Sequence, residues 1–220
     1  MIFIVSLIIA FVSITGCEGE PKFTIEEGSK RQFAVLPGRL GVTVENDSGR
    51  WHCIVNQGTL VQADSLPEAP YEASAIQVGY VYGATGLPVA RGYHYRGPYL
   101  ASPDKRYVAA SATAEPSPHN PTSLVIVDMQ TKKTVAVVKG YENRYVDGLA
   151  WSSNSNFVAI LKHSSRVGYS PLDFLAQLLG HGVLYSTYYV EVVNLAAETV
   201  AQTKLTSGVQ GSWGWVVWME

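Results

Sequence analysis

Cysteine and histidine often carry chemistry in proteins, but in this chain neither type is spaced for it. The five histidines are scattered, with no pair at the close spacing of metal ligands. The chain has no Gly-x-Ser-x-Gly turn, no His-Glu-x-x-His motif and no phosphate-binding loop. The sequence therefore predicts no catalytic residue, no metal site and no cofactor. Each histidine is expected to be an exposed or core residue: His52, His94, His119, His163 and His181.

Aromatic side chains are in excess, with 13 tyrosines and 5 tryptophans, and they favour a binding surface. The segment RGYHYRGPY, residues 91–99, is expected to be a loop with two arginines beside three tyrosines. Tyr and Arg are enriched in binding surfaces, but aromatic residues also fill space between sheets. Both interpretations stay open for this segment. The candidate ligand or partner residues are Tyr93, Tyr95, Arg96 and Tyr99.

Cys17 has a different chemical role available, the attachment of a lipid. The apolar run at residues 2–12 is too short to cross a bilayer, which needs about 20 residues, but it has the length of a secretion-signal core. The residues Ile14-Thr15-Gly16-Cys17 resemble the lipobox of bacterial lipoproteins. The resemblance implies a signal peptide over 1–16, cleavage before Cys17, and a diacylglycerol on its sulfur with a further acyl chain such as palmitate. An ordinary signal peptide or an uncleaved anchor is the alternative.

The lipobox also implies a location in the cell envelope, anchored by lipid. Residues 17–32 are polar and charged and are expected to be a lipidated tether. Glu18 is not the Asp that often retains lipoproteins at the inner membrane, so the outer membrane, facing the periplasm, is favoured in a Gram-negative cell. With lipid on Cys17, Cys53 has no disulfide partner, and its apolar surroundings predict a small buried core residue.

The remaining chain, residues 33–220, is expected to be one all-β domain. Short runs of β-branched and aromatic residues alternate with turn residues, and helical periodicity is scarce. The expected strands are 39–45, 51–56, 59–64 and 74–83. The expected turns are 46–49, 56–58 and 84–86.

Internal repeats organise the second half of the chain. Residues 99–111 align with 148–160, so that Ser102 falls on Ser152, Asp104 on Asn154 and Tyr107 on Phe157. Residues 123–140 align with 188–205, with Asp128 on Asn194, and 79–92 is a weaker copy. A period of roughly 45–50 residues is typical of four-stranded propeller blades.

These repeats, within residues 74–205, resemble the WD40-like repeats of bacterial periplasmic propellers such as that of the Tol system. The carrying segments are residues 102–109, residues 151–159 and Val127 to Lys132, with some positions of the family pattern replaced. The resemblance implies a propeller-like stack of about three to four four-stranded antiparallel blades, closed or incomplete, with Trp151 packed between blades. Residues 211–220 are expected to be a strand equivalent to 148–151. An irregular β-sandwich is the alternative.

One short helix is expected as an insertion near residues 171–179. Ser170 and Pro171 are suited to its start, and Gly180 to its end. Leu175 and Leu179 lie on its apolar side. The helix is either a cover for a sheet edge or a docking element for a partner.

Composition narrows the function. The net charge is −2 and no Lys/Arg run stands out, so no nucleic-acid partner is expected. The sequence favours a non-enzymatic binding or scaffolding module held on the membrane by its lipid, with a protein partner in the envelope. The alternatives are an envelope hydrolase or lyase acting on glycan or peptide, and a small-ligand sensor that uses the tyrosine segment.

Overall fold

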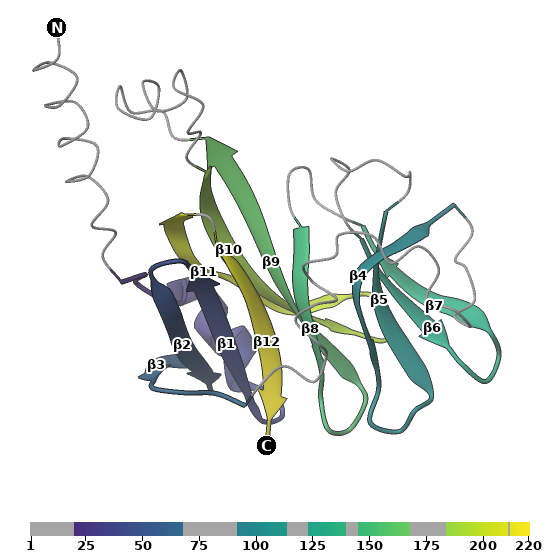
Figure 1. Cartoon of the computed structure of the whole chain (residues 1–220). Helices are drawn as coiled ribbons and strands as arrows, with labels where there is room; N and C mark the ends of the chain where they lie inside the picture. The colour runs from purple at the N-terminus through teal and green to yellow at the C-terminus, as the bar shows by residue number, and fades with distance from the viewer. Residues whose placement is uncertain (1–19, 68–91, 114–122, 140–144, 168–183, 211) are drawn as a thin grey trace, which may run out of the picture.

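The computed structural model describes residues 20–67, 92–113, 123–139, 145–167, 184–210 and 212–220, and they form an all-β fold (Figure 1). The first sheet has the order β12 (Trp213–Met219), β1 (Arg39–Asn46), β2 (Gly49–Asn56), β3 (Thr59–Ala63). The second has β4 (His94–Ala101), β5 (Tyr107–Thr113), β6 (Ser123–Asp128), β7 (Lys133–Val138). The third has β8 (Tyr145–Trp151), β9 (Phe157–Val167), β10 (Leu184–Asn194), β11 (Thr199–Gln210).

All strand pairs are antiparallel. The strands expected at 39–45, 51–56 and 59–64 and the turns expected at 46–49 and 56–58 are confirmed. The strand at 74–83, the turn at 84–86 and the helix near 171–179 lie outside the described residues.

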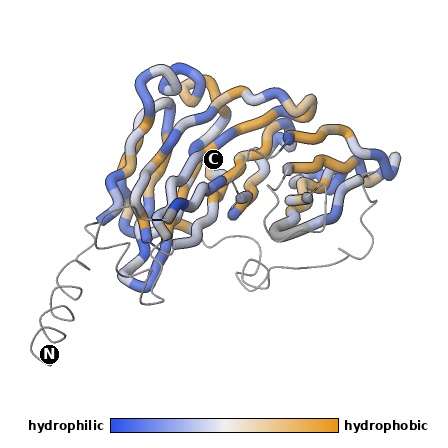
Figure 2. The backbone as a smooth tube through the Cα atoms, turned by 90° about the horizontal axis from the view of Figure 1, so that it is seen from above, coloured by the Kyte–Doolittle hydropathy of each residue, from blue (hydrophilic) through white to orange (hydrophobic). Residues whose placement is uncertain are grey.

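The third sheet lies between the other two, and its strand β8 contacts β4 on one side and β12 on the other. One apolar core, with Val42, Leu161 and Tyr188, lies between the first and third sheets. Another, with Ile126, Leu149 and Ile160, lies between the second and third. Hydrophobic stretches run along the strands of all three sheets (Figure 2). Strands buried on both faces lose the alternation of a half-exposed strand, as the fully buried β6 shows.

The repeated turn predicted from the sequence is present in both copies. Ser102 Oγ accepts a hydrogen bond from Tyr107 N at 2.9 Å, and Ser152 Oγ accepts one from Phe157 N at 3.0 Å. In the same turns Asp104 Oδ1 accepts from Arg106 N at 3.0 Å, and Asn154 Oδ1 accepts from Asn156 N at 3.1 Å. A Ser followed two residues later by Asp or Asn therefore builds the same tight turn in the second and third sheets.

Two aromatic stacks repeat where neighbouring sheets meet. Trp151 of β8 stacks on Tyr107 of the second sheet with a centroid distance of 6.3 Å. Trp218 of β12 stacks on Phe157 of the third sheet at 6.4 Å. Trp151 is 5% exposed and its Nε1 donates to Leu100 O of β4 at 2.9 Å. The expectation that Trp151 packs between sheets is therefore confirmed, and the C-terminal strand repeats its arrangement.

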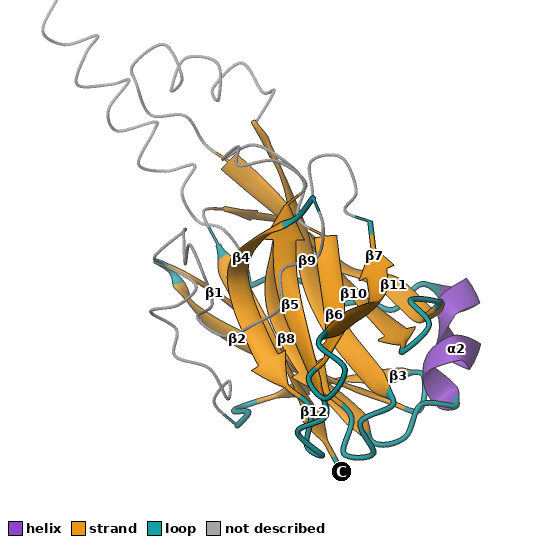
Figure 3. Cartoon of the chain, turned by 90° about the vertical axis from the view of Figure 1, so that its right-hand side faces the viewer, coloured by secondary structure: helices purple, strands orange, loops and turns teal. Residues whose placement is uncertain are grey.

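The segment that was expected to be a tether packs against the fold in its described part, contrary to the prediction. Thr24 N donates to Leu205 O at 2.7 Å, and Phe23 and Ile25 pack against the first core. A 3-10 turn, η1 (Glu27–Ser29), and a short helix, α2 (Lys30–Ala34), follow. The helix lies beside β11 (Figure 3) and buries Phe33. Alternating apolar residues thus pack residues 23–33 against the edge of the third sheet.

The segment expected as a loop at 91–99 contains most of strand β4 instead. Its pairing with β5 is interrupted between Tyr95 and Tyr99. Pro98 lies in this interruption and has no N–H to donate, which a strand at the edge of a sheet tolerates. The turn-forming residues of this segment therefore stand in an irregular edge strand and not in a loop.

Candidate functional site

The edge strands β4, β8 and β12 all begin at one end of the molecule. Near their other ends, Trp151 of β8 bonds Leu100 of β4, and Trp218 of β12 stacks on Phe157 beside β8. The starts of the three strands therefore share the opposite end, called here the upper end, which is uppermost in Figure 1. Strand β9 ends and β10 begins there too, on either side of residues 168–183.

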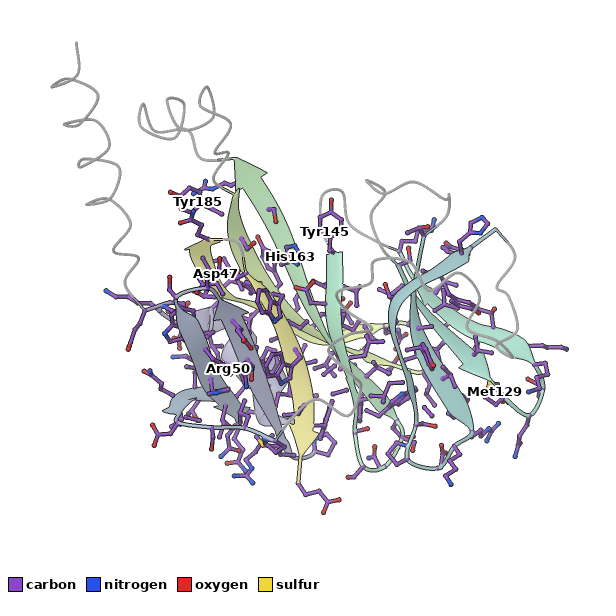
Figure 4. The ribbon with its side chains drawn as sticks, viewed as in Figure 1. Asp47, Arg50, Met129, Tyr145, His163 and Tyr185 are labelled. Atoms are coloured by element: carbon purple, nitrogen blue, oxygen red, sulfur yellow. The ribbon has the colours of Figure 1, made fainter. Side chains whose placement is uncertain are left out.

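A polar cluster lies at this upper end, built around Asp147 and His163. Asp147 Oδ2 lies 2.6 Å from His163 Nδ1. The His163 ring stacks on Tyr145 at a centroid distance of 5.2 Å and contacts Tyr188 at 5.8 Å. Figure 4 shows Tyr145 and His163 side by side, from β8 and β9. The cluster thus places a carboxylate, an imidazole and two phenols within one small region.

A β-bulge positions the carboxylate. Tyr145 pairs with His163 and Val146 with Lys162, but Gly148 then pairs with Leu161. Asp147 is the extra residue, with no cross-strand partner of its own. Bulges turn a side chain away from the direction that a regular ladder would give it. The carboxylate that meets the imidazole therefore stands at an irregular position near the start of β8, an edge strand of its sheet.

The pair is buried, and its charges perturb each other. Burial raises the pKa of Asp147, against the opposing effect of the His163 charge. Burial by itself would lower the pKa of His163, but the Asp147 charge and hydrogen bond outweigh it, and the net pKa is raised. An imidazole held this way by a carboxylate has a fixed tautomer and an increased basicity.

The cluster continues to the first sheet through a phenol. Tyr188 OH donates to Ser212 Oγ at 2.9 Å, and Ser212 directly precedes β12. Burial raises the pKa of Tyr188 far above its usual range, so the phenol stays protonated and donates. Hydrogen bonds and ring contacts therefore connect β8 to the start of β12.

A second buried polar group lies lower in the third sheet. Lys162 and Glu191 form an ion pair from adjacent strands, and Thr199 Oγ1 also donates to Glu191. Both partners of the ion pair are almost fully buried. Because each charge has a partner, this group has the character of a structural ion pair. Among the described residues, no three His, Cys, Asp or Glu side chains gather as metal ligands would.

The candidate residues from the sequence are not all together. Tyr93 and Tyr95 are partly buried against a small core of the second sheet that includes Val125 and Val127. Tyr99, in contrast, is 50% exposed. The side chain of Arg96 lies outside the described residues, as do Leu175, Leu179 and Cys17. The tyrosine segment therefore divides into two partly buried residues and one exposed one.

Two other predictions concern single side chains. Cys53 is fully buried, as expected, and burial raises the pKa of its thiol to about 12, which keeps it an unreactive thiol. His52 is buried beside Thr43, whose Oγ1 lies 2.8 Å from its Nδ1. Burial lowers the pKa of His52, with Arg50 adding to the effect. Both are buried residues of the first sheet.

Sequence reasoning did not identify Asp147 as a partner of His163. The only signal was an acid between apolar residues, Val146-Asp147-Gly148, near a strand start. No family model matches this chain, and no curated protein matches it. No helix among the described residues is long and apolar enough to cross a membrane.

Proposed function

We propose that this chain is a lipid-anchored lipoprotein of the bacterial cell envelope that binds a protein partner through its upper end. It acts as a binding or scaffolding module, with a diacylglycerol on Cys17. One observation supports the docking surface: partly buried aromatic residues from all three sheets lie at this end. They are Tyr93 before β4, Tyr145 at the start of β8, Tyr185 in β10 and Trp213 at the start of β12.

Aromatic residues at one end suit a protein partner for energetic reasons. Half-exposed Tyr and Trp side chains offer large, rigid apolar area with little entropy to lose, and they supply many binding hot spots. His94 is exposed beside them and adds a polar rim. The lower end has instead the short polar turns at 102–107 and 152–157, which bond within themselves. The upper end is thus the better docking surface of the described residues.

We further propose that the three sheets are blades of an open, propeller-like stack. The order β12-β1-β2-β3 supports this, because each of the three sheets is then a four-stranded antiparallel unit like a propeller blade, the first of them built from both ends of the chain. The repeated stacks of Trp151 on Tyr107 and Trp218 on Phe157 support it as well. In this arrangement β4, β8 and β12 are the innermost strands, and their starts surround the proposed docking end.

Site-specific photo-cross-linking in intact envelopes tests the docking surface. A benzophenone amino acid replaces His94 at the upper end or, as a matched control, the exposed Ser153 in the lower turn. We expect a discrete protein adduct from position 94 and none from position 153. Adducts from position 153 alone, or from neither position, would contradict the proposed surface.

The same cells test the anchor. Cys17→Ser removes the sulfur that would take the lipid, so the protein should move from the membrane fraction to the soluble fraction. The adduct from position 94 should then decrease if the partner lies at the membrane. Continued membrane association of Cys17→Ser would rule out lipid on this residue.

A further inference from the structure

A cavity beside the N-terminal segment, where the first and third sheets meet the upper end, points to a ligand site. It has a volume of about 420 Å³ and lies between residues 20–24, the β1–β2 hairpin and the last part of β11. This volume is within the range of small-molecule sites, roughly 300–1,000 Å³. We infer that the cavity binds a sugar that carries an anionic group, such as a phosphate or a carboxylate.

The aromatic wall of the cavity is Trp51 of β2. Trp51 lies on the same face of its strand as the core residue Cys53, so it faces the third sheet. A Cβ at Gly49 would lie 3.3 Å from the indole ring, which shows how closely the ring lies over that backbone. A fixed indole offers a flat π surface, and the C–H face of a pyranose ring packs well on such a surface.

The cavity also presents positive charge. Lys22 and Lys204 both line it, from the N-terminal segment and from β11. Among the described residues, neither ammonium takes part in an ion pair, whereas Lys30, Arg50 and Lys162 each do. Glu20 is the one carboxylate in the described lining, so lysines outnumber acids two to one there. Two unpaired cations around one cavity favour a ligand with negative charge.

Hydrogen-bonding groups of β11 complete the site. Thr206 lines the cavity and is only 3% exposed, yet its Oγ1 has no hydrogen-bond partner within the part of the chain described. A buried hydroxyl without a partner is uncommon and needs an explanation. Ser207 adds a further hydroxyl to the lining. Hydroxyl groups of this kind suit the hydroxyls of a sugar.

The backbone at this place is irregular in a way that suits a site. The pairing of β10 with β11 shifts between Ser186 and Thr187, and Gly208 is the residue passed over. Gly208 has a φ of +80° and lines the cavity, and a Cβ added to it would meet no other atom within 4 Å. A bulge residue leaves its backbone groups out of the ladder, where a ligand can use them. The left-handed φ explains why glycine stands here.

Ligand titration of the full chain tests the inference. The lipidated protein is purified in a zwitterionic detergent without sugar groups, and tryptophan fluorescence and calorimetry follow the addition of glucose 6-phosphate or glucuronate. Glucose and inorganic phosphate are the control ligands. We expect saturable binding of an anionic sugar at concentrations at least about tenfold below those needed for glucose or phosphate, because only the anionic sugar uses both Trp51 and the lysines.

Variants locate the binding. Lys204→Ala should weaken the anionic sugar at least about tenfold, and Trp51→Leu should do the same, whereas Lys133→Ala, at an exposed lysine of β7, should not change it. Equal binding of phosphate alone would reduce the site to an anion site and overturn the sugar assignment. No saturable binding of either anionic sugar, or equal binding by Lys204→Ala, would overturn the site itself. The cross-link from position 94, on β4 of the second sheet, tests the docking surface separately from these titrations.

Discussion

At the scale of single residues, the Asp147–His163 pair is expected to make the stability of the fold depend on pH. Neither side chain would be stable as an isolated buried charge. The 2.6 Å contact lets each partner solvate the other, and the stacking of Tyr145 holds the imidazole in place. Because the pKa values of both groups are raised, both bind protons more tightly in the folded state than in the unfolded state.

This linkage predicts a pH dependence of stability. A group whose folded pKa is raised stabilises the fold fully below its unfolded pKa, and this contribution is lost as the pH rises through the folded pKa. The double variant Asp147→Asn/His163→Asn removes both titrations. The unfolding free energy of the wild type minus that of the variant should therefore fall as the pH rises above the unfolded pKa of the carboxyl, about 3.9, and further above that of the imidazole, about 6.5.

Urea titrations across this pH range measure the difference. His94→Asn, at an exposed position of the same end, is the matched control and should reproduce the wild-type curve. A difference that stays constant or grows with pH would show that the pair does not titrate as inferred. The measurement is independent of any ligand or partner.

At the scale of elements, each pair of adjacent sheets is joined by a Trp from an edge strand. Trp151 contributes a buried ring, a stack on Tyr107 and a hydrogen bond to Leu100. Trp151→Ala should lower the free energy of unfolding by about 3–5 kcal/mol, since a large cavity would open between two sheets. Trp151→Phe keeps an aromatic ring but loses the N–H donor, and about 1–2 kcal/mol is expected.

Denaturant unfolding measures both variants against Tyr99→Ala. Tyr99 lies on β4 near the same sheet boundary but is half exposed, so its truncation should cost within about 0.5 kcal/mol. A loss below about 1 kcal/mol for Trp151→Ala would show that the ring does not join the sheets.

At the scale of the whole molecule, the two ends of the described chain meet in one core. The C-terminal strand β12 pairs with β1 along seven positions and adds Val216 to the core that also holds Phe33. Removing residues 213–220 would leave β1 with an unpaired edge and open that core. The truncated chain should therefore lose its cooperative unfolding transition in calorimetry.

A synthetic peptide of residues 211–220 provides the rescue. Added in excess, it should pair with β1 and restore the transition, because strand addition supplies the missing ladder and apolar residues. A control peptide with Trp215 and Val216 replaced by Asp should not restore it. A truncated chain with an unchanged melting temperature would contradict the closing role of β12.

The sequence alone determined the local chemistry. The Ser102 and Ser152 turns, the continuous apolar strand at 123–128, the burial of Cys53 and the position of Trp151 all follow from short-range patterns. These features depend on turn hydrogen bonds and on strand periodicity, which act over a few residues. The lipid on Cys17 and the protein partner were also inferred from short sequence patterns, and they remain predictions.

The tertiary structure decided what depends on strand order and register. Asp147 meets His163 because β8 pairs with β9 in this register, and sequence spacing does not show which strands pair. The N-terminal segment packs on β11, which is about 180 residues later in the chain. Its polar composition by itself predicted a free tether, because composition does not show so distant a contact. The cavity beside Trp51 has walls from three distant segments. Contacts across such separations are set by the packing of whole sheets, and local patterns do not encode them.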